Sequence, residues 1–400
     1  MALQNEFRSY PIAVATAYGR VFYGSENRVY FSQVFTDDLN SLGRCYQRND
    51  PVSSDISDTL PDDGGDILLQ NSGSIVSMVG YELGILVFAE RGVWYIYGPD
   101  SGFSATSYAV KKVTDYSIIS PDALQEYSST VMFASEEGLI VLRSNDFGIP
   151  AAINLTEQTI NSAWKEFVIN EDGTRNSGIS MSMDRSRKQL HIVTTQNPSS
   201  YFNALIYDLR LEAWYPQSYR RPVGAIDVDI DEGVVFFSFT DTVFSLDKFE
   251  ASGFTDWGVE FDSEIITSEE TLGQFSHRKQ IPNIYVIFRK TEENITGFDG
   301  TEYTYDNPSK CLFSCVFDYA RSPTGILTSP ERQIYNPNYY NFVAATASYP
   351  TPLNDNRTIV EYRDLVRGSG KAVKFRFRND GNNDLQLLGY NVEFSMRGRQ

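Results

Sequence analysis

Short apolar runs that alternate with polar positions dominate this chain, and tight turns separate them. In the stretch Ala17 to Gln33, Val21 and Tyr23 and then Val29 and Phe31 fall at every second position around a polar Gly-Ser-Glu-Asn segment. A period of two on both sides of a turn is typical of a β-hairpin. The stretch therefore predicts two paired strands, and it is the template for later hairpins.

The same design recurs along the first 250 residues. The sequence VFAERGVWYI, which begins at Val87, resembles MFASEEGLIVL, which begins at Met132, and about 45 residues separate them, a spacing found between propeller blades. Further strand and turn patterns place a second unit from Ile67, a fourth around Ile179 and a fifth around Ala225. One short helix is expected over residues 156–167. We predict a β-propeller-like domain over residues 1–250.

Longer strands follow in residues 251–400. Val373, Phe375 and Phe377 lie on one face of a predicted strand, and the residues between them are basic. Such alternation favours a β-sandwich or jelly-roll domain. A loop rich in proline and tyrosine at residues 322–352 is too long for a simple connection, so we expect it to contact a neighbour.

Composition agrees with an all-β protein of two domains. Hydrophobic residues make up 41% of the 400, and the 25 Tyr and 26 Phe suit half-buried pleated surfaces. We find no signal peptide and no apolar run of the length that spans a bilayer, so we expect synthesis in a cytoplasm and no membrane insertion.

The chain is strongly acidic, with a net charge of -18, and this disfavours a protein that reads nucleic acid. Acidity serves solubility in many proteins, and it can also repel a polyanion. The acidic groups gather in a loop at residues 49–66 and in one strand that carries three aspartates at alternate positions. The candidates for an acidic lining are Asp62, Asp63, Asp66, Asp227, Asp229 and Asp231.

Neither acidic segment matches a known calcium loop. An EF-hand that began at Asp227 would need glycine where Glu232 stands and an acid where Ser238 stands. A solvated face is the alternative to calcium for the strand, and a solvated loop is the alternative to a metal site for residues 49–66. We therefore predict no metal and no cofactor.

Motifs for catalysis are missing from the sequence. The two histidines, His191 and His277, are expected to be structural, and neither a GxSxG nor an HExxH motif occurs. Cys45, Cys311 and Cys315 form neither a zinc motif nor a disulfide framework. Two carboxylates can together hydrolyse a glycosidic bond, but among 52 acidic residues the sequence does not indicate which two would form such a pair. We predict that the protein is not an enzyme.

Several segments resemble tail nozzle proteins of short-tailed bacteriophages, a family also called tail tubular protein B. The similarity covers residues 13–145 and continues more weakly beyond them, and family members carry a longer region before the first segment, which leaves the number of blades open. The matching segments are AYGRVFYGSENRVYFSQ, GRCYQRNDPVSSDISD, LPDDGGDI, LVFAERGVWYIYG, FSATSYAVKKVTDYSIISP, FASEEGLIVL and the closing KAVKFRFRNDGNNDLQLLGYNVEFSMRGR.

This resemblance implies a structural virion protein that forms a homohexameric tube below the portal and adaptor. DNA would pass through the tube during ejection without specific binding, and tail fibres would attach to it. The protein would be assembled in the cytoplasm of the host bacterium and reside in the virion tail. The alternative is a propeller-type polysaccharide depolymerase that acts on host surface glycans.

A ring built from identical subunits needs two different, complementary faces. The last 34 residues carry seven basic and three acidic groups, against the acidity of the chain as a whole. From this charge asymmetry we predict that Lys374, Arg376 and Arg378 contact an acidic loop of a neighbouring subunit.

Overall fold

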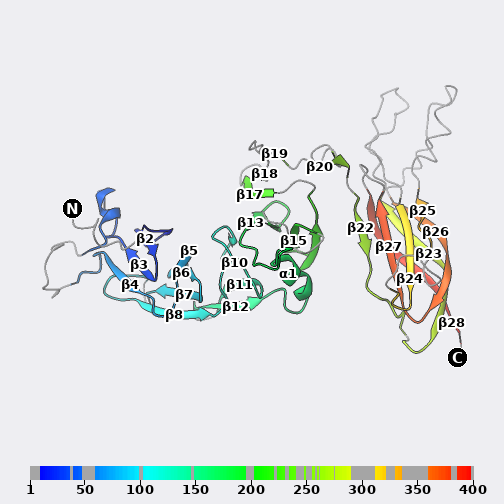
Figure 1. The fold of residues 1–400 in the computed structure, drawn as a ribbon, viewed down its shortest axis with the longest axis horizontal. Coiled ribbons are helices and arrows are strands. Elements are labelled where there is room, and N and C mark those ends of the chain that lie inside the picture. The colour runs from blue at the N-terminus through cyan, green and yellow to red at the C-terminus, as the bar shows by residue number, and fades with distance from the viewer. Residues whose placement is uncertain are drawn as a thin grey trace, which may run out of the picture. The chain divides into compact units, whose positions relative to one another are not determined.

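The protein is all-β in this computed structural model, as the sequence predicts (Figure 1). By contacts, the chain divides into two compact units, residues 1–249 and 250–400. The structure describes residues 10–36, 39–46, 59–98, 102–145, 148–194, 202–219, 223–229, 234–239, 247–248, 255–256, 259–260, 262–273, 275–289, 311–320, 329–335, 359–379 and 385–397.

The first unit consists of successive antiparallel meanders, in which neighbouring strands of the sheet are also neighbours in the chain. Four meanders have four strands each and the fifth has three. The first contains β1 (Ala13–Ala17), β2 (Arg20–Ser25), β3 (Arg28–Phe31) and β4 (Gly65–Leu68); the second β5 (Ile75–Tyr81), β6 (Gly84–Ala89), β7 (Gly92–Tyr97) and β8 (Ala109–Thr114); the third β9 (Leu124–Tyr127), β10 (Thr130–Ser135), β11 (Gly138–Ser144) and β12 (Pro150–Asn154); the fourth β13 (Ile179–Asp184), β14 (Gln189–Thr194), β15 (Ala204–Asp208) and β16 (Ala213–Gln217); the fifth β17 (Val223–Asp229), β18 (Val234–Phe239) and β19 (Asp247–Lys248).

Tight turns close the hairpins where the polar segments predict them. Glu26 and Asn27 connect β2 to β3, and Glu26 adopts a positive φ of 52°. The turns before β7 and β11 each place a glycine at the start of the following strand, Gly92 with φ 127° and Gly138 with φ 153°. A Cβ on Gly138 would lie 2.0 Å from Oγ1 of Thr156, so only glycine fits there.

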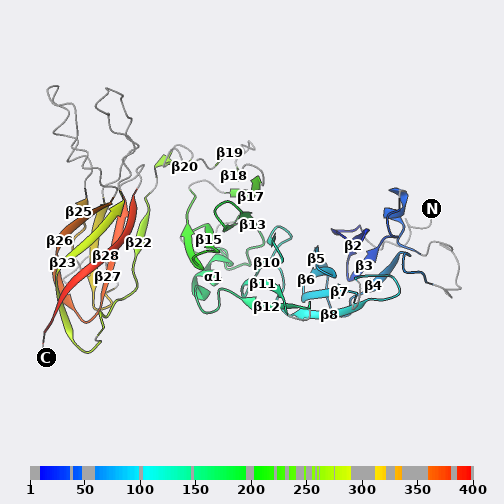
Figure 2. The ribbon, with the colours of Figure 1, turned by 180° about the vertical axis from the view of Figure 1, so that it is seen from behind.

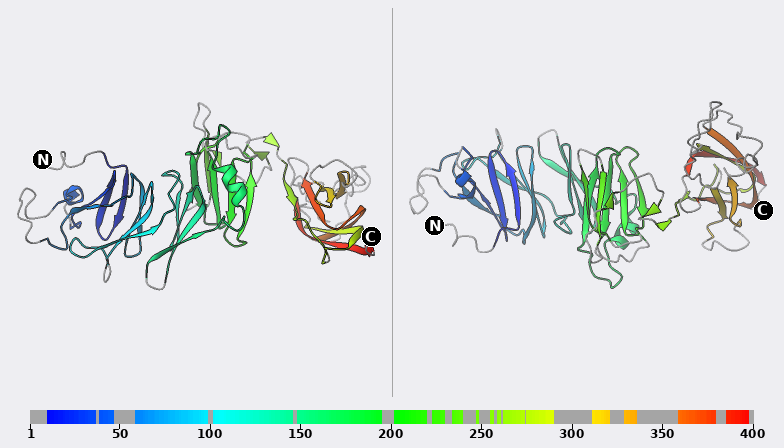
Figure 3. Two further views of the ribbon diagram at one scale, coloured as in Figure 1. Left: turned by 60° about the horizontal axis from the view of Figure 1, so that its bottom comes forward. Right: turned by 90° about the horizontal axis from the view of Figure 1, so that it is seen from above.

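The sheets of successive meanders pack face to face (Figure 3). One apolar cluster joins the first two meanders, and a second cluster joins the second, third and fourth. The second meander contributes to both: Ile85 and Val87 of β6 face the first cluster, and Leu86 and Phe88 face the second. This sharing follows from the alternation of side chains along a strand.

The helix in this unit is shorter than the sequence predicts. It is α1 (Asn161–Phe167), visible from behind in Figure 2, and it begins five residues after the expected start. Asn154 Oδ1 instead accepts hydrogen bonds from the backbone of Thr156 and Glu157, so it caps the turn before the helix. Buried Trp164 fixes α1 by donating its Nε1 proton to the Ser135 carbonyl at 2.9 Å.

The predicted start of the second unit of strands at Ile67 is wrong. Residues Gly65–Leu68 form β4, which pairs with β3 and completes the first meander. The acidic segment is therefore an insertion inside the first meander, after the 3₁₀ turn η2 (Leu39–Gly43). Residues 47–58 of this segment lie outside the described part of the chain.

The second unit is a two-layered β-sandwich, as the alternating pattern predicts. One sheet has the strand order β22-β27-β24-β25 and the other β26-β23-β28. A short pair, β20 (Thr255–Asp256) and β21 (Val259–Glu260), precedes them. The strands of the two sheets are β22 (Glu264–Ile266), β23 (Arg278–Arg289), β24 (Cys311–Phe317), β25 (Arg332–Tyr335), β26 (Ile359–Gly370), β27 (Val373–Asn379) and β28 (Gln386–Arg397).

The sandwich core lies between the inner faces of these sheets. Val373, Phe375 and Phe377 are buried there, on the face of β27 that the sequence assigns to them, and they meet Ile284 and Phe288 of β23. The Tyr390 ring lies tilted against the Phe377 ring, and its hydroxyl donates to Glu270 Oε1. Of the loop predicted at residues 322–352, only residues 329–335 are described, and they include β25.

Candidate functional site

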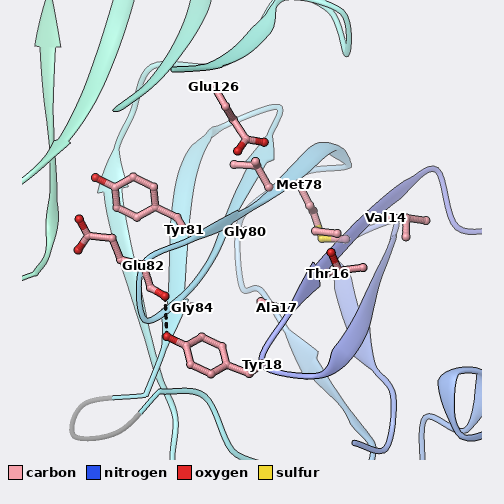
Figure 4. Close-up of a pocket in the computed structure, with 12 residues that line it drawn as sticks. Val14, Thr16, Ala17, Tyr18, Met78, Gly80, Tyr81, Glu82, Gly84 and Glu126 are labelled. Carbon is pink, nitrogen blue, oxygen red and sulfur yellow. Dashed lines mark hydrogen bonds between the residues drawn. The ribbon is translucent and has the colours of Figure 1, made fainter. Parts of the chain in front are cut away.

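The first strand of each meander lies at a free edge of its sheet among the described residues. β1 lies beside β5, and β13 lies beside both β9 and β17, so these edges gather on one side of the first unit. A cavity of about 680 Å³ opens along β1 and the end of β5 and reaches Glu126 of β9 (Figure 4). The cavity is the candidate site because it combines three meanders.

The turn between β1 and β2 shapes one wall of the cavity. Tyr18 and Gly19 both adopt positive φ, 52° and 66°, as a two-residue hairpin turn requires. The Tyr18 hydroxyl donates to the Glu82 carbonyl at 2.5 Å, which ties the first meander to the β5–β6 turn (Figure 4). Gly102 packs on the Tyr18 ring so closely that a Cβ would lie 2.1 Å from it.

The ionisable side chains of the cavity wall are acids and tyrosines, without Lys, Arg or His. Glu126 points from β9 toward the β5 residues (Figure 4), and burial raises its pKa. Glu82 Oε2 accepts a hydrogen bond from Ser144 Oγ at 2.9 Å, which links the wall to the third meander. The wall therefore offers carboxyl groups and no basic side chain to a ligand, which disfavours anions.

The tyrosines beside the cavity remain protonated near neutral pH. Burial raises the pKa of Tyr95 to about 12, and the Glu82 carboxylate adds to the shift. Burial, and then Glu82, also raise the pKa of Tyr18. Neither hydroxyl is an activated nucleophile, because nucleophilic catalysis requires a lowered pKa or an adjacent base. The arrangement can hold a neutral or cationic group.

The acids of the loop before β4 differ in their surroundings. Asp62 is exposed, whereas Asp63 is buried and its Oδ2 accepts the backbone N–H of Leu60 at 2.8 Å. Asp66 forms an ion pair with Arg28 across the first sheet. Asp62 and Asp66 are thus both exposed, with Asp66 held by Arg28, while Asp63 stabilises the turn.

A buried arginine, which the sequence reasoning missed, holds this loop. The Arg20 guanidinium donates to the carbonyls of Ser32, Pro61 and Asp63, and it lies 5.6 Å from the centroid of the Phe31 ring. Its only sequence signal is a charged residue at the first position of an otherwise apolar strand. Because three carbonyls share one cation, the loop is fixed to the first meander.

The strand predicted to carry aspartates is β17, the first strand of the fifth meander. Asp227 is exposed on it, opposite to the side where Val223 and Ile226 are buried. The side chain of Asp229 and the whole of Asp231 lie outside the described residues. The structure does not bring Asp227 and Asp62 together in the cavity, whose wall contains neither of them.

The basic strand is β27, and its arginines are engaged within the chain. Arg376 pairs with Glu264, and Arg378 contacts both carboxylate oxygens of Glu331 at 3.1 and 2.8 Å. This bidentate bond lowers the pKa of Glu331 and raises the pKa of Arg378. Lys374 is half-buried on the same face. The role of this face in subunit contact stays a prediction, and a neighbour would have to compete with these pairs.

Histidine and cysteine take structural positions. His191 is buried on β14, and neither ring nitrogen has a hydrogen-bond partner. Burial lowers its pKa to about 4, although the nearby Asp184 opposes this shift. The three cysteines are free and buried, and burial raises the pKa of Cys311 to about 12. Such thiols are poor nucleophiles.

Within the described ranges, the acids, histidines and cysteines form no group of three that could hold a metal ion. In that same part of the chain no helix has the length and apolar character needed to cross a membrane.

Comparisons with known proteins give no family assignment. No protein-family model matches the sequence, and no curated protein matches it. Among solved structures, the extracellular domain of a hybrid two-component system from B. thetaiotaomicron has a TM-score of 0.35 at 15% identity, over 62% of this chain and 28% of that chain. A nidogen/laminin complex gives 0.31 at 11% identity, over 58% and 73%, and the designed Ika8 protein gives 0.29 at 10%, over 61% and 72%. TM-scores of this size support no conclusion about the fold or the function of this chain.

Proposed function

We propose that this chain is a structural subunit of a bacteriophage tail nozzle, a ring of identical copies through which DNA leaves the virion. The supporting observation is where the family-like segments lie. The segments around Ala17, Val87 and Phe133 coincide with the hairpins β2–β3, β6–β7 and β10–β11 of three successive meanders. The segments that resemble the family thus lie in the repeated hairpins of the first unit.

The acidity of the chain is compatible with a conduit. A ring that multiplies a net charge of -18 by its number of subunits repels phosphates, so DNA slides through without being held. Asp62 and Asp227 are exposed, and we assign them this role among the acidic candidates. The proposal includes contacts of the ring with adaptor proteins above it and with tail fibres.

Electron microscopy of the purified full chain, alone and with its adaptor ring, tests this proposal. We expect closed rings with a central channel, formed by the chain itself or upon addition of the adaptor. A protein that stays monomeric at high concentration under both conditions would contradict the proposal.

One observation favours a second candidate, the depolymerase. The cavity wall includes two carboxylic acids, Glu82 and Glu126, and burial raises the pKa of Glu126, which is the direction of shift that the acid of a glycosidase requires. If the cavity hydrolyses host surface polysaccharide, Glu126→Gln abolishes the release of reducing ends while Glu90→Gln leaves it unchanged. The nozzle proposal instead expects no glycan turnover by the unmodified chain.

A further inference from the structure

Two sheet faces of this chain expose apolar side chains, and they belong to different units. The first-meander face consists of the outward side chains of β1 and β2 together with the chain before and after η2. It comprises Ile12, Val14, Thr16, Val21, Phe35 and Leu39. The sandwich face is the outer side of the β26-β23-β28 sheet and comprises Tyr285, Ile287, Ile359, Arg363 and Leu365.

Among the described residues, the first meander is the end of the stack of sheets, and no other described sheet packs on the first-meander face. The opposite face of the same sheet is buried against the second meander through Ala15, Phe22 and Phe31. On the outward side, by contrast, Ile12 is 63% exposed and Val14 is 56% exposed. Cross-strand pairing places Val14 next to Tyr23 and Thr16 next to Val21, so these side chains form one continuous surface.

A cleft of about 470 Å³ deepens the first-meander face. Its lining includes Thr16 and Val21 of the paired strands together with Phe35, Leu39 and Leu42. Leu39 projects from η2 with 74% of its surface exposed. Exposed apolar side chains that gather around a cleft are typical of a protein contact surface rather than of a solvated one.

The sandwich face is extended and only partly charged. Ile359 and Leu365 of β26 are 50% and 53% exposed, and the central strand β23 adds Tyr285 and Ile287 between the flanking strands. Arg363 lies over the Tyr285 ring at 5.8 Å and keeps its charge at the surface. Because the opposite side of this sheet forms the sandwich core, its outer side is the one available to a partner.

Charge selects which surfaces of two copies can meet. Two chains that each carry -18 repel one another over most of their surface, so contact requires local complementarity. On the first meander, Asp62 is exposed next to the segment that leads to Phe35, since its carbonyl accepts the Val34 N–H, whereas the exposed Asp66 is paired with Arg28. Among the described side chains, the exposed charges on the strands of the sandwich face are three arginines and two glutamates, namely Arg278, Arg289, Arg363, Glu361 and Glu393.

We propose that the first-meander face of one copy packs against the sandwich face of the next copy. Two different faces on one chain form a heterologous contact, and such contacts close into a ring when the rotation permits. The inference rests on the proposed ring function and names its subunit contact. It differs from the contact predicted from sequence, since β27 lies in the other sheet of the sandwich.

Sedimentation velocity of full-length variants tests this contact. Val14→Asp places a charge on the first-meander face, and Leu365→Asp places one on the sandwich face. We expect each variant alone to lose assembly and to sediment as a monomer, while the unmodified chain forms rings. Leu211→Asp is the matched control, because Leu211 is 69% exposed in the turn between β15 and β16, outside both faces, and should assemble normally.

Mixing the two defective variants distinguishes a heterologous contact from a symmetric one. The Val14→Asp copy retains an intact sandwich face and the Leu365→Asp copy retains an intact first-meander face, so the mixture should form one-to-one dimers and nothing larger. A mixture that stays monomeric, or a single variant that still forms rings, overturns the inference. Circular dichroism melts establish that each variant is folded, and Leu39→Asp with Ile359→Asp serves as a second pair.

Failure of this inference is distinguishable from failure of the proposed function. If the unmodified chain forms rings and both single variants also form rings, the proposed contact is contradicted and the nozzle function is not. An unmodified chain that never assembles, even with the adaptor, contradicts the nozzle function together with the contact that depends on it.

Discussion

His191 is the residue whose surroundings differ most from those that its chemistry favours. Its imidazole is buried on β14 without a hydrogen-bond partner, beside the buried Asp184, whose Oδ2 also lacks one. Burial holds the pKa of His191 at about 4, below its ordinary value of 6.5. His191 therefore binds a proton less readily in the folded state than in the unfolded chain.

We expect this depressed pKa to make the first unit sensitive to acid. The His191 contribution to stability is complete above pH 6.5 and is lost as the pH falls toward 4, by about 3 kcal/mol in total, since each pKa unit corresponds to about 1.4 kcal/mol. Urea unfolding between pH 4 and 8 measures it. His191→Leu should flatten this part of the curve.

Arg20 provides a second prediction at this scale. Arg20→Met removes the donor for three carbonyl groups and leaves them in a partly buried site, which should lower the free energy of unfolding by about 3 kcal/mol. Hydrogen exchange of residues 59–66 should accelerate as the loop detaches. Arg20→Lys keeps the charge but not the planar fork, so an intermediate loss is expected. Equal stability of all three proteins would show that the arginine does not hold the loop.

The hairpin turns decide the structure at the scale of elements. Gly138 opens β11 at a φ that L side chains rarely adopt, and Oγ1 of Thr156 occupies the space of a Cβ. Gly138→Ala should destabilise the first unit by about 2 kcal/mol, as judged by chemical unfolding. Gly43→Ala is the control, because a Cβ there meets nothing within 4 Å. A loss of similar size in both variants would contradict the role of the turn.

Local patterns predicted the elements better than they predicted how the elements pair. The alternation in β27 identified its buried face, because a strand between a core and solvent carries that pattern in its own residues. In β2, Arg20 and Phe22 are buried on the core side, whereas Val21 and Tyr23 are only half-buried on the outer face, where the Tyr23 hydroxyl donates to the Leu42 carbonyl. The assignment of Ile67 to a new unit failed because the β3–β4 pairing spans the acidic insertion.

The candidate cavity could not be predicted from the sequence, for a related reason. Tyr18, Glu82 and Glu126 come from three separate meanders, and only the packing of first strands brings them to one wall. The acidic candidates were visible as clusters, but a cluster in sequence does not reveal burial. Asp63 stabilises a turn while its neighbour Asp62 faces solvent.

At the scale of the whole molecule, the excess of acids has a measurable consequence for DNA. In an assembled ring of Asp62→Asn, Asp227→Asn chains, weaker repulsion should let duplex DNA be retained, and the retention should vanish as salt is raised. Fluorescence anisotropy of a labelled duplex in about 50 mM salt measures this, with rings of the unmodified chain as the reference. The exposed pair Glu157→Gln, Glu166→Gln removes two charges from the region of α1 and controls for net charge. Equal retention by both double variants would contradict a specific role for the two aspartates.

The order of strands in the first unit also bears on how the chain folds during synthesis. Most sheets pair strands that are adjacent in the chain, so their contacts form over short loops and each can be completed as it leaves the ribosome. The first meander is the exception, because β3 waits for β4 beyond the acidic insertion. Closing that loop costs more entropy than closing a hairpin. The amino-terminal sheet, although synthesised first, is therefore expected to gain its last strand only after the whole acidic insertion has been synthesised.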